Sequence, residues 1–202
     1  MTEEDPDACR DFYSEVWRGY TTLAFLGGGA LMLFSRVFAQ ILFADAYMDA
    51  WIYIPILTLA TVFTALCTFL GSVYFSSKKT VWSMITAFVG AGLNVALNLL
   101  LIPEWGAMGA SVATFASYFA VCILRLITTR RLIPFKQEWV RGGINTLLLG
   151  GITLVVTVSE QDPAKTLLMY GIAVGIYVLS LAFNARAVVS LLKNLKRMIR
   201  RS

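Results

Sequence analysis

A chain of 202 residues that is 58% hydrophobic and 14% charged, with a mean hydropathy of +0.72, cannot bury its apolar surface in one soluble core. The net charge of +5 does not indicate nucleic-acid binding, because the Lys and Arg residues stand at the ends of apolar runs rather than along one soluble face. Three widely spaced cysteines and no histidine predict neither a metal site nor a cofactor. The composition therefore predicts an all-α integral membrane protein.

The chain divides into three parts by its polarity. Residues 1–18 are acidic and polar and lack the basic start of a signal peptide. We expect them to form a cytoplasmic lead-in, either an amphipathic connector or a frayed tail. Residues 19–188 are expected to form one membrane domain, and residues 189–202 a basic cytoplasmic tail on the membrane surface.

The membrane domain contains six apolar runs, each long enough to cross a hydrocarbon core of about 30 Å. All Lys and Arg except Arg36 and Lys165 lie in the segments of one side, so the positive-inside rule places both termini in the cytoplasm. The predicted spans are residues 20–43, 51–75, 81–102, 108–128, 142–158 and 166–188.

The stretch from Leu93 to Tyr118 predicts a tight membrane hairpin. Pro103 and Gly106 should end one helix and let the next begin within about four residues. Small residues on both helices predict close packing, and Gly171 and Gly175 give the same pattern in the last span. The residues assigned to turn or packing are Gly90, Pro103, Gly106, Gly109, Ala113, Ser117, Gly171 and Gly175.

Two polar stripes interrupt the apolar runs. Thr86, Gly90, Asn94 and Asn98 recur every fourth residue on one face of the third span. The second span carries a threonine stripe that either bonds to neighbouring helices or lines a wet path. The candidate binding residues from these stripes are Thr61, Thr64, Thr68, Asn94 and Asn98.

Arg36 is the charged residue well inside the first predicted span, roughly 10 Å from its outer end at 1.5 Å per residue. A charge at this depth in the membrane costs free energy unless an opposite charge or a polar group pairs with it. One interpretation is snorkelling to the outer surface, with Asp45 or Asp49 as partner. The other is that Arg36 faces a central cavity and binds a diphosphate. Arg125, near the end of its span, is expected to snorkel.

The hairpin resembles the matching part of the polysaccharide and oligosaccharide flippases, the O-antigen type of the multidrug/oligosaccharidyl-lipid/polysaccharide exporter superfamily. The resemblance extends from about Phe34 to about Arg131 and covers their C-terminal half only. The residues that carry it are Asn94, Asn98 to Leu101, Ile102, Pro103, Gly106, Gly109, Ala110, Ala113 and Thr114.

The resemblance implies a six-helix lobe of a two-lobe transporter that moves lipid-linked oligosaccharide across the bacterial cytoplasmic membrane by alternating access. Implied partners are membrane lipid, a polyprenyl-diphosphate-linked glycan, and either a missing N-terminal six-helix half or a second copy. We expect no enzymatic activity, because no catalytic motif is present. The competing interpretations are a multidrug or small-solute exporter of the same superfamily and a truncated, non-transporting membrane subunit.

Overall fold

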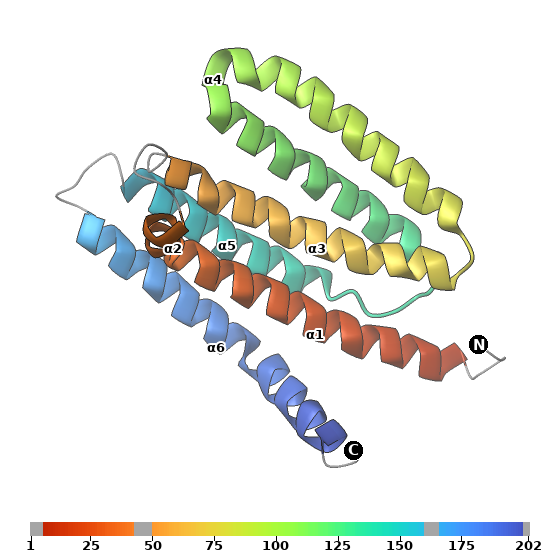
Figure 1. The fold of residues 1–202 in the computed structure, drawn as a ribbon. Coiled ribbons are helices and arrows are strands. Elements are labelled where there is room, and N and C mark those ends of the chain that lie inside the picture. The colour runs from red at the N-terminus through yellow and green to blue at the C-terminus, as the bar shows by residue number, and fades with distance from the viewer. Residues whose placement is uncertain (1–5, 43–49, 160–165, 200–202) are drawn as a thin grey trace.

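The computed structural model describes residues 6–42, 50–159 and 166–199, and these residues form helices joined by short connections (Figure 1). The prediction of an all-α protein is confirmed, because no strand occurs in these ranges. The helices are α1 (Pro6–Leu33), α2 (Ser35–Leu42), α3 (Ile54–Ser76), α4 (Thr80–Arg130), α5 (Trp139–Ser159) and α6 (Thr166–Ile199).

The helix α4 folds back on itself. Its backbone is helical except at Gly106, whose φ of 55° and ψ of −134° are accessible mainly to glycine. Pro103 precedes this reversal. The result is a hairpin of two arms, residues 80–105 and 107–130, that lie side by side (Figure 1). The reversal occurs at the residue where the sequence predicts a turn.

The two antiparallel arms of the hairpin contact each other at small residues. A Cβ on Gly109 would meet the backbone of Leu101, and a Cβ on Gly90 would lie 2.5 Å from the side chain of Val121. Such approaches require glycine and resemble the small-residue contacts of membrane helices. Ala113 and Ser117 are also buried.

The first predicted span differs from the structure at both ends. α1 begins at Pro6, so the expected lead-in from residue 6 onward continues into the span as one helix, with the buried Trp17 packed against the core. The helix then breaks at Phe34, and α2 leaves at 64° to α1. Residues 20–42 are therefore not one straight helix, and Ser35 and Ala39 of α2 are buried on the far side of the bend.

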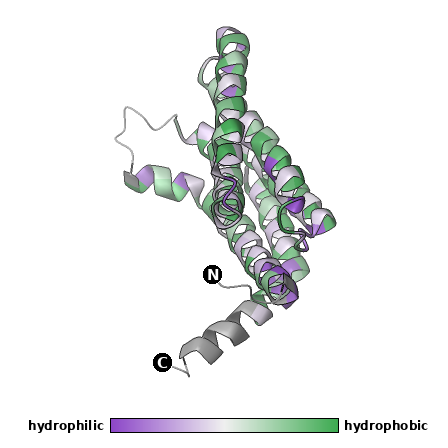
Figure 2. Cartoon of the chain, turned by 90° about the vertical axis from the view of Figure 1, so that its right-hand side faces the viewer, coloured by the Kyte–Doolittle hydropathy of each residue, from purple (hydrophilic) through white to green (hydrophobic). Residues whose placement is uncertain are grey.

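Four helices in the described ranges are long and apolar enough to cross a membrane, and the bent pair α1–α2 adds a fifth if it counts as one span. The hairpin α4 is one of the four. Large apolar side chains remain exposed on its first arm and on α6, and hydrophobic residues recur along every helix drawn in colour in Figure 2. This is the surface of an all-α membrane protein.

The order of packing places the hairpin at one side of the bundle. α4 packs on α3, α3 packs on α1, and α1 contacts both α5 and α6. The N-terminus and the connections α3–α4 and α4–α5 lie toward one end, and the Gly106 turn and α2 lie toward the other (Figure 1).

Candidate functional site: a polar cavity between α3 and the α4 hairpin

A cavity of about 460 Å³ lies between α3 and the two arms of α4. α3 contributes Thr64, Cys67 and Thr68, and the first arm contributes Gly90 and Asn94. The second arm contributes Thr114, Ser117, Tyr118, Val121 and Arg125. Hydroxyl and amide groups therefore gather around this cavity.

The guanidinium of Arg125 is the most constrained group of this cavity. The residue is 9% exposed. Its Nη1 donates to the carbonyl oxygen of Cys67 at 2.6 Å, its Nη2 to the carbonyl oxygen of Ser83 at 3.2 Å, and its Nε to the hydroxyl of Thr86 at 3.0 Å. These three bonds join α3 and both arms of the hairpin.

The partners of the Arg125 guanidinium in the described part of the chain are two backbone carbonyl oxygens and a hydroxyl, and none of them is a carboxylate. An arginine has five N–H donors, and three of them are used here. A buried cation with donors left over is costly, and an anion in the cavity would relieve that cost. The expectation that Arg125 snorkels to the membrane surface is wrong, because the side chain is buried between α3 and α4.

The threonine and serine hydroxyls of the cavity already donate their protons to backbone carbonyls, so they can serve a ligand only as hydrogen-bond acceptors. Thr64 and Thr68 donate to the carbonyls of Ala60 and Thr64, one turn earlier in α3. Thr114 and Ser117 do the same in the second arm. Their oxygens keep lone pairs for a ligand donor. The cavity thus offers a cation at one point and acceptors elsewhere, which suits a molecule that carries both anionic and hydroxyl groups.

The structure brings some of the predicted binding residues together and separates others. Thr64, Thr68 and Asn94 line the cavity. Asn98 lies one turn further along the first arm and donates to Asn94. Thr61 is exposed and donates to Leu57 within α3, away from this cavity.

Arg36 lies on α2, where its side chain is exposed and its guanidinium sits 5.6 Å from the ring centre of Trp51. It does not line the α3–α4 cavity. Asp45 and Asp49, its partners in the snorkelling interpretation, lie outside the described residues. Its role in binding a diphosphate stays a prediction.

Gly171 and Gly175 face open space in the part of the chain that the structure describes. Both are exposed, and a Cβ at either position would meet nothing within 4 Å. Their packing role stays a prediction that needs a helix from outside the described residues.

Sequence reasoning missed Arg125 as a cavity residue. The spacing along the sequence could have predicted its inward position. Gly109, Ala113 and Ser117 mark the packing face of this helix at four-residue intervals, and Val121 and Arg125 continue the same interval. A charge that continues a small-residue packing face points into the bundle rather than toward its surface.

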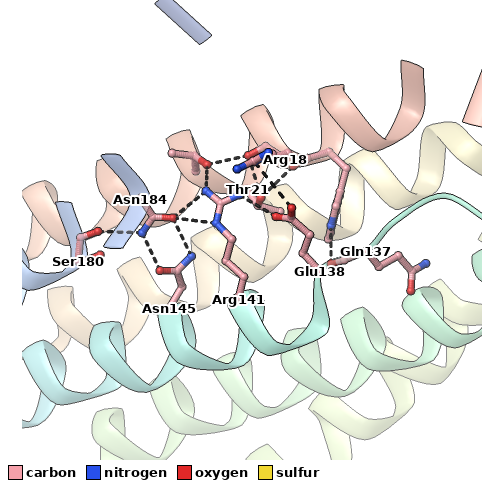
Figure 3. Close-up of polar contacts among 10 residues, drawn as sticks. Arg18, Thr21, Gln137, Glu138, Arg141, Asn145, Ser180 and Asn184 are labelled. Carbon is pink, nitrogen blue, oxygen red and sulfur yellow. Dashed lines mark hydrogen bonds and ion pairs between the residues drawn. The ribbon is translucent and has the colours of Figure 1, made fainter. Parts of the chain in front are cut away.

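A second polar cluster joins α1, α5 and α6 near the start of α5 (Figure 3). Arg141 donates to Glu138 at 2.8 Å, to Asn184 at 2.8 and 3.1 Å, and to Thr22. Asn145 and Asn184 bond to each other through both amides. Because each member has partners within the cluster, it ties three helices together and leaves little capacity for a ligand.

An all-α bundle of long apolar helices with exposed apolar faces is the structure of a multi-pass membrane protein. Residues 2–192 match the family described as lipid II flippase MurJ. The chain therefore belongs to the lipid II flippase MurJ family, a family of transporters and not of catalytic enzymes. This membership supports a lipid-linked glycan flippase family in general and does not extend to the O-antigen type.

Two curated relatives are similar to parts of the chain. One is an uncharacterized membrane protein of Methanocaldococcus jannaschii, 26% identical over 132 residues, which are 64% of this chain and 25% of that protein. The other is the uncharacterized membrane protein YabM of Bacillus subtilis, 30% identical over 112 residues, which are 52% of this chain and 20% of that protein. The chain thus matches a quarter or less of the length of either relative. No solved structure matches the chain.

Proposed function

We propose that this chain is one six-span lobe of a flippase that moves a polyprenyl-diphosphate-linked glycan across the bacterial cytoplasmic membrane by alternating access. In this proposal α1 crosses the membrane and bends into α2 at the outer surface. The helices α3, α5 and α6 form one span each, and each arm of α4 crosses on its own. A second lobe, either a missing N-terminal half or a second copy of the chain, completes the transporter.

The observation that carries the proposal is the buried guanidinium of Arg125 in a cavity lined by Thr64, Thr68 and Asn94. A glycan diphosphate presents phosphate oxygens for the unused N–H donors of Arg125 and sugar hydroxyls for the threonine oxygens. Family membership supports the same substrate class. A cation exporter would instead need an acceptor charge inside a span, and the cavity lining includes no acidic residue.

The orientation follows from the charges at the two ends of the bundle. Lys78, Lys79, Arg131 and Lys136 lie in the connections α3–α4 and α4–α5, toward the end that also holds the N-terminus (Figure 1). The positive-inside rule supports a cytoplasmic location for this end, and for both termini. An engineered cysteine at the exposed Glu104 should then react with an impermeant reagent added outside, and cysteines at Lys78 and Lys136 should not.

The test of function is translocation of a fluorescent lipid-linked glycan in proteoliposomes that contain the chain and its complementary lobe. Thr68→Leu removes a cavity hydroxyl and should lower the rate several-fold, whereas Thr61→Leu removes an exposed hydroxyl of the same helix outside the cavity and should leave it unchanged. Equal rates in both variants would contradict the cavity assignment. Transport of a fluorescent cation in place of the glycan would favour the multidrug exporter, and transport of neither would favour a non-transporting subunit.

A further inference from the structure

Tyr118 is the aromatic residue of the α3–α4 cavity. Its neighbours on the second arm of α4, Phe115 and Phe119, pack against Phe63 with ring centres 5.7 and 5.1 Å away. Tyr118 itself is 39% exposed and lies outside the hydrophobic core. Among the described residues, no ring packs against Tyr118 and no side-chain hydrogen bond holds its hydroxyl. One wall of this polar cavity is therefore an aromatic ring that the fold does not use for its own packing.

Arg125 lies on the same face of the arm as Tyr118. The two residues are seven positions apart, so two helical turns separate their Cα atoms, about 10 Å along the axis. Cys67 of α3 contacts both residues, because its thiol donates to the carbonyl oxygen of Tyr118 at 3.7 Å and its carbonyl oxygen accepts from Nη1 of Arg125 at 2.6 Å. The guanidinium thus reaches the residue of α3 that also contacts Tyr118. The cation and the ring line neighbouring parts of one cavity.

The part of the cavity near Tyr118 carries neutral polar groups. Gly90 of the first arm lies against Val121, so the antiparallel arms bring Asn94, one turn further on, to the level of Tyr118. The Oδ1 atom of Asn94 accepts from Asn98 at 3.0 Å, and its Nδ2 keeps N–H donors for a ligand. A flat ring beside an amide donor suits an uncharged sugar, which has both C–H and hydroxyl groups to offer.

We propose that Tyr118 determines the specificity of the cavity for a glycan, because the sugar next to the diphosphate packs on its ring while the diphosphate binds Arg125. This inference rests on the proposed function, since it assigns two parts of that substrate to two parts of the same cavity. One face of a pyranose ring consists largely of C–H groups and packs against an aromatic face. The diphosphate and its first sugar are joined directly, as neighbouring subsites require. The cavity therefore distinguishes a glycosylated lipid diphosphate from the bare one.

Native mass spectrometry of the purified chain tests this specificity in micelles that contain equal amounts of two lipids. One lipid is a polyprenyl diphosphate, and the other is the same lipid with a disaccharide attached. We expect the unmodified chain to retain the glycosylated lipid about fivefold more than the bare one. Tyr118→Leu should abolish this preference and leave retention of the bare lipid unchanged. Tyr118→Phe should keep the preference, because the ring remains.

Phe119→Leu is the matched control for Tyr118→Leu. Phe119 is the next residue of the arm and is 38% exposed, but it lines a different cavity, among α1, α3, α4 and α5. We expect this variant to retain the two lipids in the same ratio as the unmodified chain. A preference that persists in Tyr118→Leu, or one that Phe119→Leu also loses, would overturn the assignment of Tyr118 while the proposed function stands. Retention of neither lipid by the unmodified chain would contradict the proposed function itself, and this inference with it.

Discussion

Arg125 donates a hydrogen bond from Nε to the hydroxyl of Thr86 at 3.0 Å, across the open end of the α4 hairpin. Thr86→Val keeps the shape of the side chain but removes this acceptor. We expect the free energy of unfolding in detergent to fall by about 1–3 kcal/mol, because a buried charged donor loses its partner. Thr61→Val, at an exposed threonine, should change it by less than about 0.5 kcal/mol. Similar losses in both variants would mean that the bond to Arg125 contributes nothing of its own.

Gly90 sets the distance between the hairpin arms. A Cβ at this position would lie 2.5 Å from Cγ2 of Val121, a buried β-branched side chain with little freedom to move. Gly90→Ala should lower the free energy of unfolding by about 1–3 kcal/mol, and the added change Val121→Ala should restore part of it. The control is Gly92→Ala, where the new Cβ meets open space. Thermal unfolding of the three proteins checks this order, and a Gly90→Ala protein as stable as Gly92→Ala would contradict it.

Gly106 makes the reversal of α4. Its φ of 55° with ψ of −134° lies in a region that residues with a Cβ avoid. Gly106→Ala should cost about 1–3 kcal/mol through backbone strain alone, since no atom lies within 4 Å of the new Cβ. Gly27→Ala, in a regular part of α1 with equally open space, should not destabilise the protein. Detergent unfolding followed by circular dichroism measures both, and an unchanged Gly106→Ala would argue against this backbone conformation.

Asn145 and Asn184 are bonded through both amides and share Arg141 as a neighbour. Asn184→Leu leaves Asn145 and Arg141 short of acceptors, so a double-mutant cycle with Asn145→Leu should give a coupling of about 0.5–3 kcal/mol. The double variant should therefore lose less stability than the two single variants together. Asn184→Leu combined with Thr86→Val, which lies in the hairpin, serves as the additive control. Additivity in both cycles would rule out the paired amides.

The helix α2 presents three faces around its axis. Ser35 and Ala39 are buried, and the polar side chains of Arg36 and Gln40 are exposed on another side. The exposed apolar side chains of α2 are Val37, Phe38 and Ile41, and Phe34, directly before the helix, is exposed as well. This pattern predicts a helix that lies in the membrane interface with its apolar face in lipid.

Spin labels placed singly along residues 34–41 test the position of α2. Accessibility to oxygen should peak at Val37, Phe38 and Ile41, and accessibility to a water-soluble nickel reagent at Arg36 and Gln40. A steady change with depth along the helix would indicate that α2 continues across the membrane instead. Low accessibility to both reagents on the apolar face would indicate that another protein segment covers it.

The sequence by itself determined the features that depend on local composition. Apolar runs of membrane-spanning length give the helices, because a backbone in lipid must satisfy its hydrogen bonds within the segment. The turn at Gly106 was also predictable, since Pro103 and Gly106 act through their own backbone geometry. The same apolar runs predicted an all-α, multi-pass membrane protein.

Only the tertiary structure decided which polar residues meet. The sequence places Arg36 well inside its predicted span and Arg125 near the end of its span, yet Arg36 is exposed on α2 and Arg125 is buried between α3 and both arms of α4. The partners of Arg125 are Cys67, Ser83 and Thr86, about forty to sixty residues away along the chain. The spacing of residues shows which side chains share one face of a helix, but it does not show which other helix packs against that face. The burial and pairing of a charge are set by that neighbour, so they emerge only when the helices pack.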